Sequence, residues 1–226
     1  TYSAFVPNKK GYDLAYLAGI RSYAIAIGAT EQMNLSNIKK GLADTFLMAG
    51  DLLDRASVDG VAIHVYLSVA FECPYEGKVP ENRVIDQVAS LMKHKPARLV
   101  IADTIGAGNP AEVQSMMENL INDYGSDRLG CHFHDTRAMG LANVYAALQA
   151  GVRQFDSSAG GLGGCPFAPG AKGNVATEDV SMLCDSMGYE TGINMAKLLD
   201  AVDLLSDLIG TPQGGRAYSW LSKQCA

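Results

Sequence analysis

Two histidines separated by one residue are the side chains of this sequence with the clearest capacity for chemistry. His132 and His134 end an apolar run and are followed by Asp135-Thr136. In an extended strand, the side chains of residues i and i+2 lie on the same face. We therefore expect both imidazoles to converge at the carboxyl end of one strand, where they can form half of a divalent-metal site. The alternative is that one histidine packs in the core and the other caps the strand.

Two further polar residues stand at the ends of predicted elements. Asp103 follows the apolar run Arg98–Ala102, and Asn174 comes shortly before a predicted helix. Asp103 can act as a turn residue or a helix N-cap, and Asn174 can act as a helix N-cap. The amide oxygen of Asn174 can also bind a hard cation, and two imidazoles with oxygen ligands suit Mg²⁺ or Mn²⁺ better than structural zinc. A carboxylate such as Asp103 can accept a proton beside such a site.

A cysteine in a glycine-rich stretch is another candidate for chemistry. Cys165 lies within Gly160–Pro166, which contains four glycines. Free cysteines are mostly buried and inert. A glycine-rich segment is, however, typical of a loop that closes over a substrate. Cys165 is therefore either a packing residue or a reactive thiol on such a loop.

Composition excludes several classes of partner. The 226-residue chain is 48% hydrophobic, enough to bury a core, and its formal net charge is −6. It has no basic stripe, so nucleic acid is not expected as a partner. The longest apolar stretch, Val61–Phe71, is too short to span a bilayer, and Thr1–Lys10 does not resemble a signal peptide. Five cysteines without a Cys-x-x-Cys pair indicate reduced thiols and a cytoplasmic protein.

Strand–loop–helix units repeat along the chain without a linker. The apolar runs show little polar alternation, which is typical of parallel strands covered on both faces. Strands are predicted at Tyr2–Val6, Tyr23–Ile27, Val61–Val69, Arg98–Ala102, the run that ends at the histidine pair, and Val152–Asp156. Polar residues gather after the strands, where a TIM (β/α)8 barrel carries its active site. The sequence therefore predicts an α/β fold of the TIM-barrel type.

An open doubly wound sheet is the competing fold. Residues 106–111 loosely match the dinucleotide-binding pattern G-x-G-x-x-A. That fold needs a carboxylate on the next strand to bind a ribose, and here this strand carries the two histidines. We therefore favour the barrel.

The predicted helices complete about six of the eight strand–helix units of a barrel. They cover a segment after Pro7-Asn8, Ile38–Ala56, Pro80–Met92, Pro110–Tyr124, Leu141–Ala150, Glu178–Met187 and Met195–Ile209. We expect an incomplete TIM barrel that lacks about two N-terminal units. Residues 1–226 would form a single catalytic domain, with C-terminal helices from about residue 179.

Several motifs together resemble the 3-hydroxy-3-methylglutaryl-CoA (HMG-CoA) lyase family. The matching stretches are Cys73–Lys78, Asp103–Gly106, His132–Thr136, Gly160–Pro166 and Gly173–Asp179. The resemblance runs from Pro7 to about Leu199. The His-x-His-Asp-Thr motif is shared with the wider superfamily of isopropylmalate and homocitrate synthases, whereas the two cysteine-containing loops are more specific to the lyases.

The resemblance implies a fold, a reaction and a set of site residues. His132, His134 and Asn174 match the ligands of a divalent metal, Mg²⁺ or Mn²⁺, and His132 also matches a histidine implicated in proton transfer. Cys165 matches the catalytic cysteine, and Asp103 matches an aspartate near the substrate. The substrate implied is an acyl-CoA, cleaved to acetyl-CoA and acetoacetate by a retro-Claisen reaction. An Asp-Gly-x-Arg-type motif on the family's first strand, which carries a metal ligand and an arginine, does not occur in this sequence.

Other functions stay open at this stage. One alternative is an acyl-CoA-dependent synthase of the isopropylmalate or homocitrate type, which the chain resembles in part. A second is a lyase for another branched hydroxyacyl-CoA, and a third is an inactive fragment. The family resemblance implies a homodimer. It points to a bacterial, cytoplasmic form, with a mitochondrial location as the alternative.

Overall fold

A curled, fully parallel sheet forms the centre of the molecule. The computed structural model describes residues 2–164 and 173–224. The sheet contains six strands in the order β1-β2-β3-β6-β7-β8, and each neighbouring pair is parallel. The strands are β1 (Ala4–Phe5), β2 (Ser22–Gly28), β3 (Ala62–Ser68), β6 (Arg98–Asp103), β7 (Leu129–Phe133) and β8 (Phe155–Asp156). All six strands predicted from the sequence are present, and the α/β prediction is confirmed.

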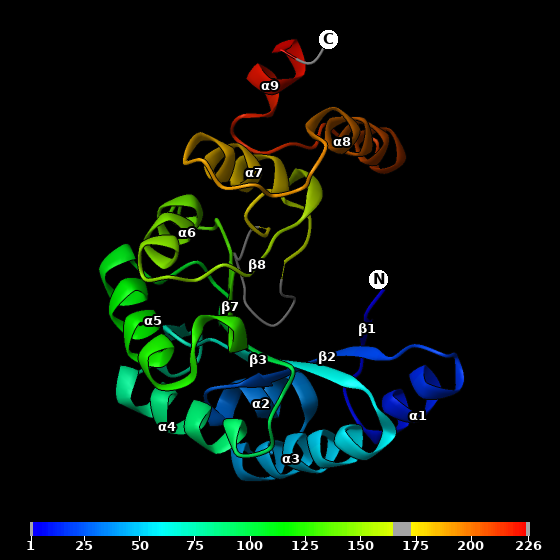
Figure 1. Cartoon of the computed structure of the whole chain (residues 1–226), viewed down its shortest axis with the longest axis vertical. Helices are drawn as coiled ribbons and strands as arrows, with labels where there is room; N and C mark the ends of the chain where they lie inside the picture. The colour runs from blue at the N-terminus through cyan, green and yellow to red at the C-terminus, as the bar shows by residue number, and fades with distance from the viewer. Residues whose placement is uncertain (1, 165–172, 225–226) are drawn as a thin grey trace.

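Helices cover the convex face of this sheet, and the strands line the inside of the arc (Figure 1). The helices that connect the strands are α1 (Lys9–Leu17), α2 (Glu31–Ile38), α3 (Leu42–Asp59), α4 (Glu81–Met92), α5 (Pro110–Tyr124) and α6 (Gly140–Gln149). Among the described residues, β1 and β8 each pair on one side only, so the sheet forms an open arc rather than a closed ring. The arrangement is that of a partial barrel.

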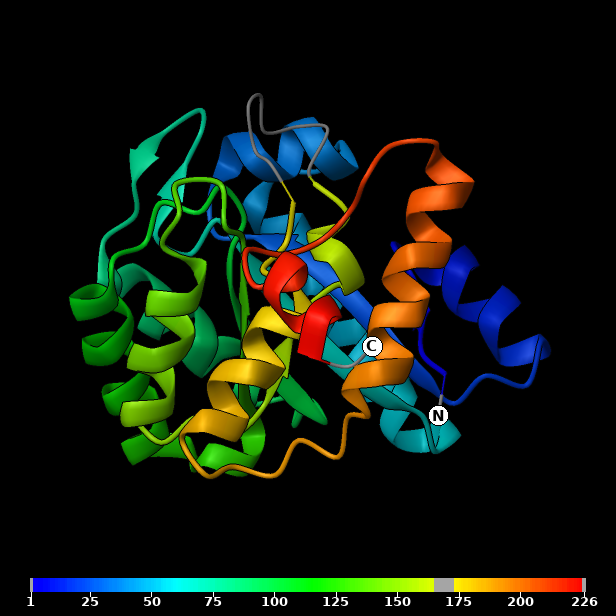
Figure 2. The same cartoon turned by 90° about the horizontal axis from the view of Figure 1, so that it is seen from above.

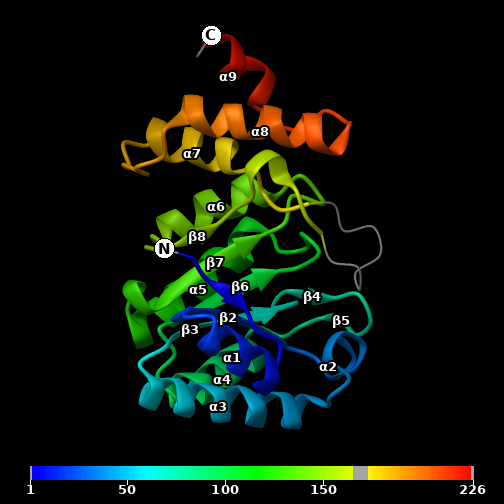
Figure 3. The same cartoon turned by 90° about the vertical axis from the view of Figure 1, so that its right-hand side faces the viewer.

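Three helices follow β8 and lie together at that edge of the sheet (Figures 2 and 3). They are α7 (Thr177–Ser186), α8 (Met195–Ile209) and α9 (Tyr218–Gln224), and two short 3₁₀ helices occur at Ser126–Arg128 and Ala159–Gly161. Among the helices described, none has both the length and the apolar character that a bilayer crossing requires.

Two local predictions were wrong. The helix expected over residues 38–56 begins later, at Leu42, and runs to Asp59 as α3, whereas the separate helix α2, which ends where Lys39 adopts a left-handed φ of 58°, was not expected. The loop expected at residues 73–78 contains a two-stranded antiparallel hairpin, with strands β4 (Glu72–Cys73) and β5 (Gly77–Lys78). Gly77 has a φ of 74°, which glycine adopts without strain at such a turn.

The strands separate bulky from small side chains by alternation. Ile25 and Ile27 on β2 are buried among the apolar side chains of the core, whereas Ala24 and Ala26 line a cavity. Burying large aliphatic side chains is the main favourable contribution to folding, at roughly 25 cal/mol per Å² of apolar surface. The small residues leave space on the concave side, and this space contains the candidate site.

His64 gives the fold a dependence on pH. It is half-buried on β3, directly opposite Arg98 on β6. Burial and, to a smaller extent, the positive charge of Arg98 lower the pKa of His64. The unfolded chain therefore binds a proton at His64 more readily than the folded chain, and the free energy of unfolding falls as the pH falls below about 6.5.

We predict that His64→Gln makes the free energy of unfolding less sensitive to pH. Urea denaturation of the wild type and the variant between about pH 8 and pH 5 measures the free energy of unfolding as a function of pH. At pH 8 the His64 imidazole is neutral in both the folded and the unfolded chain, so this pH serves as the reference. The difference in stability between the two proteins should change as the pH falls. Parallel curves over the whole range would contradict the assignment.

Candidate functional site

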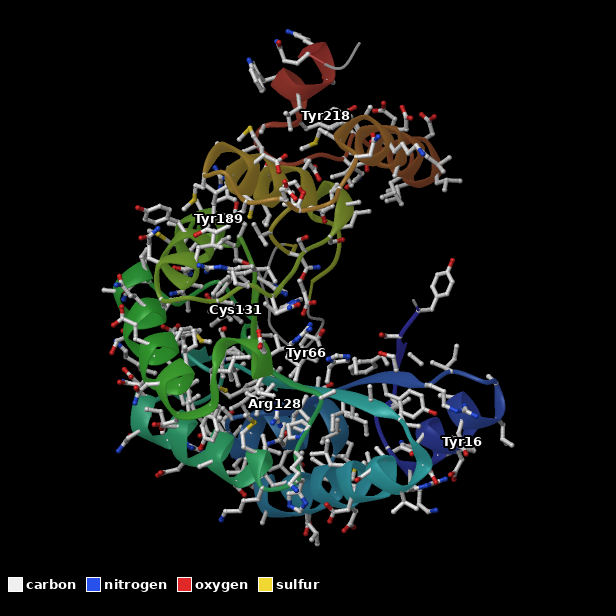
Figure 4. The ribbon with its side chains drawn as sticks, in the orientation of Figure 1. Tyr16, Tyr66, Arg128, Cys131, Tyr189 and Tyr218 are labelled. Carbon is white, nitrogen blue, oxygen red and sulfur yellow. The ribbon has the colours of Figure 1, made fainter. Side chains whose placement is uncertain are left out.

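A cavity of about 550 Å³ lies on the concave face of the sheet. Figure 4 shows Tyr66 on this inner side. The described residues that line the cavity are Phe5, Ala24, Ala26, Met33, Asn37, Tyr66, Ser68, Ala102, Thr104, His132, His134, Asp156 and Gly164. Six strands or the residues just after them thus contribute side chains to one space.

The two histidines face this cavity from the end of β7, as their spacing predicts. Their ring centroids are 5.3 Å apart, and the ring planes are tilted by 55°. The Nδ1 atom of each ring is buried and has no hydrogen-bond partner among the described residues. Burial, with a smaller contribution from His132, lowers the pKa of His134 to about 4. His134 is therefore neutral at pH 7 and has a lone pair available to bind a cation.

Backbone pairing brings Asn174 next to His134. The two residues form an isolated antiparallel bridge. The N–H of Val175 donates to the carbonyl of Phe133 at 3.0 Å. The Asn174 amide nitrogen donates to the carbonyl of Leu162 at 2.7 Å, which fixes the side chain against the glycine-rich stretch. Gly163 permits this approach, because a Cβ atom there would lie 2.7 Å from the amide nitrogen.

The donors at this point fit a hard divalent cation. His132 and His134 offer imidazole nitrogens to the cavity, and the backbone of Asn174, whose side chain carries an amide oxygen, pairs with His134. Buried imidazole nitrogens without partners are costly, and binding an ion or water removes that cost. Within residues 2–164 and 173–224, no group of three or more His, Cys, Asp and Glu side chains is placed to hold an ion.

Asp103 occupies the end of β6 but is oriented differently from the histidines. Its neighbours Ala102 and Thr104 line the cavity, whereas its carboxylate accepts hydrogen bonds from the backbone N–H groups of Ala107 and Gly108 at 2.8 and 2.9 Å. Burial raises the pKa of Asp103. These contacts hold the loop before α5, so Asp103 acts as a turn residue, and the N-cap of α5 is Asn109. Its role beside the substrate stays a prediction.

Cys165 lies outside the described residues. The residue before it, Gly164, lines the cavity. The described chain resumes at Gly173, whose carbonyl accepts a hydrogen bond from the N–H of Asp135 at 3.2 Å. Both ends of the intervening segment therefore stand beside the histidine pair.

Sequence reasoning missed two polar side chains of the cavity, Tyr66 and Asp156. Tyr66 lies between His64 and Ser68 on β3, and this alternation of polar residues was the available signal. Asp156 was recognised only as the end of a strand. Burial and the nearby carboxylate of Asp156 raise the pKa of Tyr66. The pKa of Asp156 is lowered: burial opposes this, and His132 and Tyr66 outweigh burial by stabilising the carboxylate.

Loops at the rim of the cavity are joined by ion pairs. Arg137, which follows β7, donates to Glu72 of the β4–β5 hairpin at 2.8 Å. Arg216 donates to Asp135 at 2.9 Å. Asp135 also accepts a hydrogen bond from the N–H of Gly140 at 2.8 Å, at the start of α6. These contacts place the hairpin and the segment before α9 around the histidine pair.

Two buried acids at the start of α7 fix the ends of neighbouring loops. Glu178 is fully buried and accepts hydrogen bonds from the N–H groups of Gly160 and Gly215 at 3.1 and 2.6 Å. Asp179 accepts hydrogen bonds from the N–H groups of Arg216 and Ala217 at 2.8 and 2.9 Å. Carboxylates in a first helical turn are also stabilised by the helix dipole. The base of the glycine-rich stretch is thereby tied to the segment before α9.

The parallel sheet and the position of the site at its strand ends are those of a TIM-barrel enzyme. A family model described as HMGL-like matches residues 2–205. The chain belongs to this HMGL-like family, and the family resemblance inferred from its motifs is confirmed.

Individual relatives support the same assignment. A hydroxymethylglutaryl-CoA lyase of Bacillus subtilis, YngG, is 39% identical over 96% of this chain and 72% of its own length. An (R)-citramalyl-CoA lyase of Chloroflexus aurantiacus is 35% identical over 93% of this chain and 67% of its own length. The chain is therefore similar to lyases named for two different acyl-CoA substrates.

Solved structures of such lyases share the fold. The crystal structure of a Bacillus subtilis HMG-CoA lyase superposes with a TM-score of 0.93 and 38% identity, over 98% of this chain and 74% of that chain. The HMG-CoA lyase of Acinetobacter baumannii in complex with coenzyme A and 3-methylmalate gives a TM-score of 0.92 and 32% identity, over 96% of this chain and 71% of that chain. The TIM-barrel prediction is confirmed by this similarity.

We predict that Glu178→Gln loosens both loops that this carboxylate holds. An amide has one acceptor oxygen, so one of the two backbone N–H groups loses its partner, at a cost of about 1–3 kcal/mol. Amide hydrogen exchange at Gly160 and Gly215 should accelerate, and the free energy of unfolding should fall. Glu190→Gln, at an exposed position after α7, is the control. Unchanged exchange at both glycines would show that Glu178 does not anchor these loops.

Proposed function

We propose that this chain cleaves 3-hydroxy-3-methylglutaryl-CoA to acetyl-CoA and acetoacetate. The observation that carries the proposal is the pair of His132 and His134 at one cavity of an HMGL-like chain, with Asn174 bridged to His134 through the backbone. Relatives named hydroxymethylglutaryl-CoA lyase align with nearly the whole chain. The acyl-CoA class of substrate is supported by the related structure that contains coenzyme A.

The proposed cofactor is Mg²⁺ or Mn²⁺, held by His132, His134 and Asn174. The unpartnered Nδ1 of His134, the position of His132 in the cavity wall and the backbone pairing of Asn174 with His134 support this set of ligands. A divalent cation supplies Lewis acidity, which lowers the pKa of a neighbouring hydroxyl by several units. The low pKa of His134 keeps its imidazole in the form that can bind such an ion.

The proposed reaction moves one proton from oxygen to carbon. A base takes the proton from the tertiary alcohol of the substrate, and the bond between C2 and C3 then breaks. Acetoacetate leaves, and the electron pair of the broken bond forms the enolate of acetyl-CoA. The enolate carbon takes up a proton to give acetyl-CoA, so atoms and charge balance.

His132 and Cys165 are the proposed proton carriers. His132 lines the cavity, and its one lone-pair nitrogen can accept the alcohol proton in a state in which it does not bind the ion. Asp103 is the other candidate base, but its carboxylate is engaged by two backbone N–H groups. Cys165 is proposed to protonate the enolate, which is supported by the position of Gly164 in the cavity wall.

The wall opposite the histidines suits an apolar acyl group. Ala24, Ala26 and Met33 line that part of the cavity. Small apolar side chains leave room for the branched carbon of the substrate and exclude water from the enolate. The second candidate substrate is a different branched hydroxyacyl-CoA. Two relatives are named for such substrates, citramalyl-CoA and 3-hydroxy-3-isohexenylglutaryl-CoA.

Three further proposals accompany this function. Residues 1–226 belong to one catalytic domain, the protein acts as a homodimer, and it works in the cytoplasm. Bacterial relatives support the last proposal, although other relatives are mitochondrial. The described cysteines Cys73, Cys131 and Cys184 are free and buried, which agrees with a reducing compartment.

Acetoacetate release from HMG-CoA tests the function directly. We predict product formation by the full-length protein with Mg²⁺ or Mn²⁺, and its loss after chelation. Cys165→Ser should lower kcat by about 10²- to 10⁴-fold, because a serine hydroxyl is a much weaker acid than a thiol. The same variant should bind Mn²⁺ as tightly as the wild type.

The controls separate the roles and the substrates. Cys184→Ser, at a buried position on α7 away from the cavity lining, should keep normal turnover. Unchanged kcat in Cys165→Ser would remove the thiol from the mechanism. Faster cleavage of citramalyl-CoA than of HMG-CoA would assign the second substrate.

We predict that His134→Ala weakens Mn²⁺ binding by at least ~10-fold. Removing a residue that only hydrogen-bonds to a metal ligand already lowers metal affinity by about that factor, and removing the ligand itself should lower it at least as much. Isothermal titration or Mn²⁺ electron paramagnetic resonance measures the affinity without substrate. His94→Ala is the matched control, since His94 contacts Asp54 in the outer layer. Equal affinity in His134→Ala and the wild type would exclude His134 as a ligand.

A further inference from the structure

A group of partly buried polar side chains surrounds His132 on the concave face of the sheet. It consists of Tyr66 on β3, Arg98 on β6 and Asp156 on β8. Figure 4 shows Tyr66 pointing to the inside of the arc. Polar groups are costly to bury without partners, so a group of this kind in a barrel interior calls for a physical reason.

His132 and Asp156 face each other on adjacent strands. They are directly paired in the β7–β8 register. The Nδ1 atom of His132 lies 3.8 Å from Oδ2 of Asp156. Both atoms are buried, and neither has a hydrogen-bond partner in the part of the chain that the structure describes. A buried donor and a buried acceptor that face each other are satisfied together when the imidazole turns slightly toward the carboxylate.

We propose that Asp156 is a positioning residue that orients His132 by accepting a hydrogen bond from its Nδ1–H. The inference rests on the proposed function of His132 at the cavity. With the proton held on Nδ1, the lone pair on Nε2 is directed away from Asp156 and is free to bind a cation or accept the substrate proton. Such an outer-shell carboxylate fixes the tautomer and the ring orientation of a histidine ligand.

Tyr66 packs against His132, and Arg98 acts on Asp156 through its charge. The rings of Tyr66 and His132 are 6.0 Å apart at 83°, an edge-to-face contact that limits rotation of the imidazole. Arg98 provides a positive charge toward Asp156. Gly130 leaves space for Arg98, because a Cβ atom there would lie 3.1 Å from its Cδ. Three strands thus support one imidazole.

Asp156 has a structural alternative, in which it only stabilises the β8 edge of the sheet. The two roles predict different results for the same substitution. A structural role changes the free energy of unfolding but leaves the His132 tautomer as it is. A positioning role changes the tautomer and the metal affinity, and both effects depend on the presence of His132.

The first experiment is ¹⁵N NMR of the metal-free full-length protein, with His132→Gln used to assign the His132 signals. We expect His132 to carry its proton on Nδ1 in the wild type. In Asp156→Asn, we expect the tautomer population to shift toward Nε2–H, because an amide group can donate to Nδ1. Asp123→Asn, at an exposed position on α5, should leave the wild-type signals unchanged. An unchanged tautomer in Asp156→Asn would overturn the proposal.

The second experiment measures Mn²⁺ affinity and kinetics in a double-mutant cycle. Asp156→Asn should weaken Mn²⁺ binding by about 10- to 100-fold and lower kcat more than it raises KM. In the His132→Ala background, the same substitution should have little further effect on Mn²⁺ affinity. Equal losses in both backgrounds would overturn the proposal. Failure of the wild type to bind Mn²⁺ would refute the proposed cofactor, and the tautomer measurement would still decide the role of Asp156.

Discussion

The parallel register of β6, β7 and β8 is the constraint on which the candidate site depends. It places Ala102, His132 and Asp156 side by side on three neighbouring strands. Each parallel pair is fixed by evenly spaced backbone hydrogen bonds. A slip of one residue in β7 would turn both histidines toward the helices and bring Phe133 into the cavity. The geometry of the site is therefore a property of the sheet and not of the β7 sequence alone.

The same alternation that builds the core also forms the cavity. On β2, isoleucines pack outward against the helices, and alanines face inward. The outward residues provide the stability, since burial of large apolar side chains is the dominant favourable contribution to folding. The inward residues leave a space that can exclude water around a substrate. Stability and site shape thus depend on opposite faces of one strand.

Acidic side chains around the cavity act mainly through backbone contacts. Asp103 holds the loop after β6, Asp135 binds the start of α6, and Glu178 joins two glycine-containing segments. Ionised carboxylates accept several N–H groups at once, so they are well suited to fix irregular chain near a site. An acid at a strand end is therefore weak evidence for a catalytic base until its partners are known.

The sequence by itself determined the features that depend on near neighbours in the chain. Continuous apolar runs specified the strands, the helix at Pro110–Tyr124 was placed correctly, and the two-residue spacing put both histidines on one face. The break at Lys39 could not be predicted, because the apolar pattern gives no sign of a left-handed residue there. The tertiary structure alone decided that Asp103 turns to the backbone and that Asp156 faces His132. Contacts between strands distant in sequence are set by sheet register and curvature, which no local periodicity encodes.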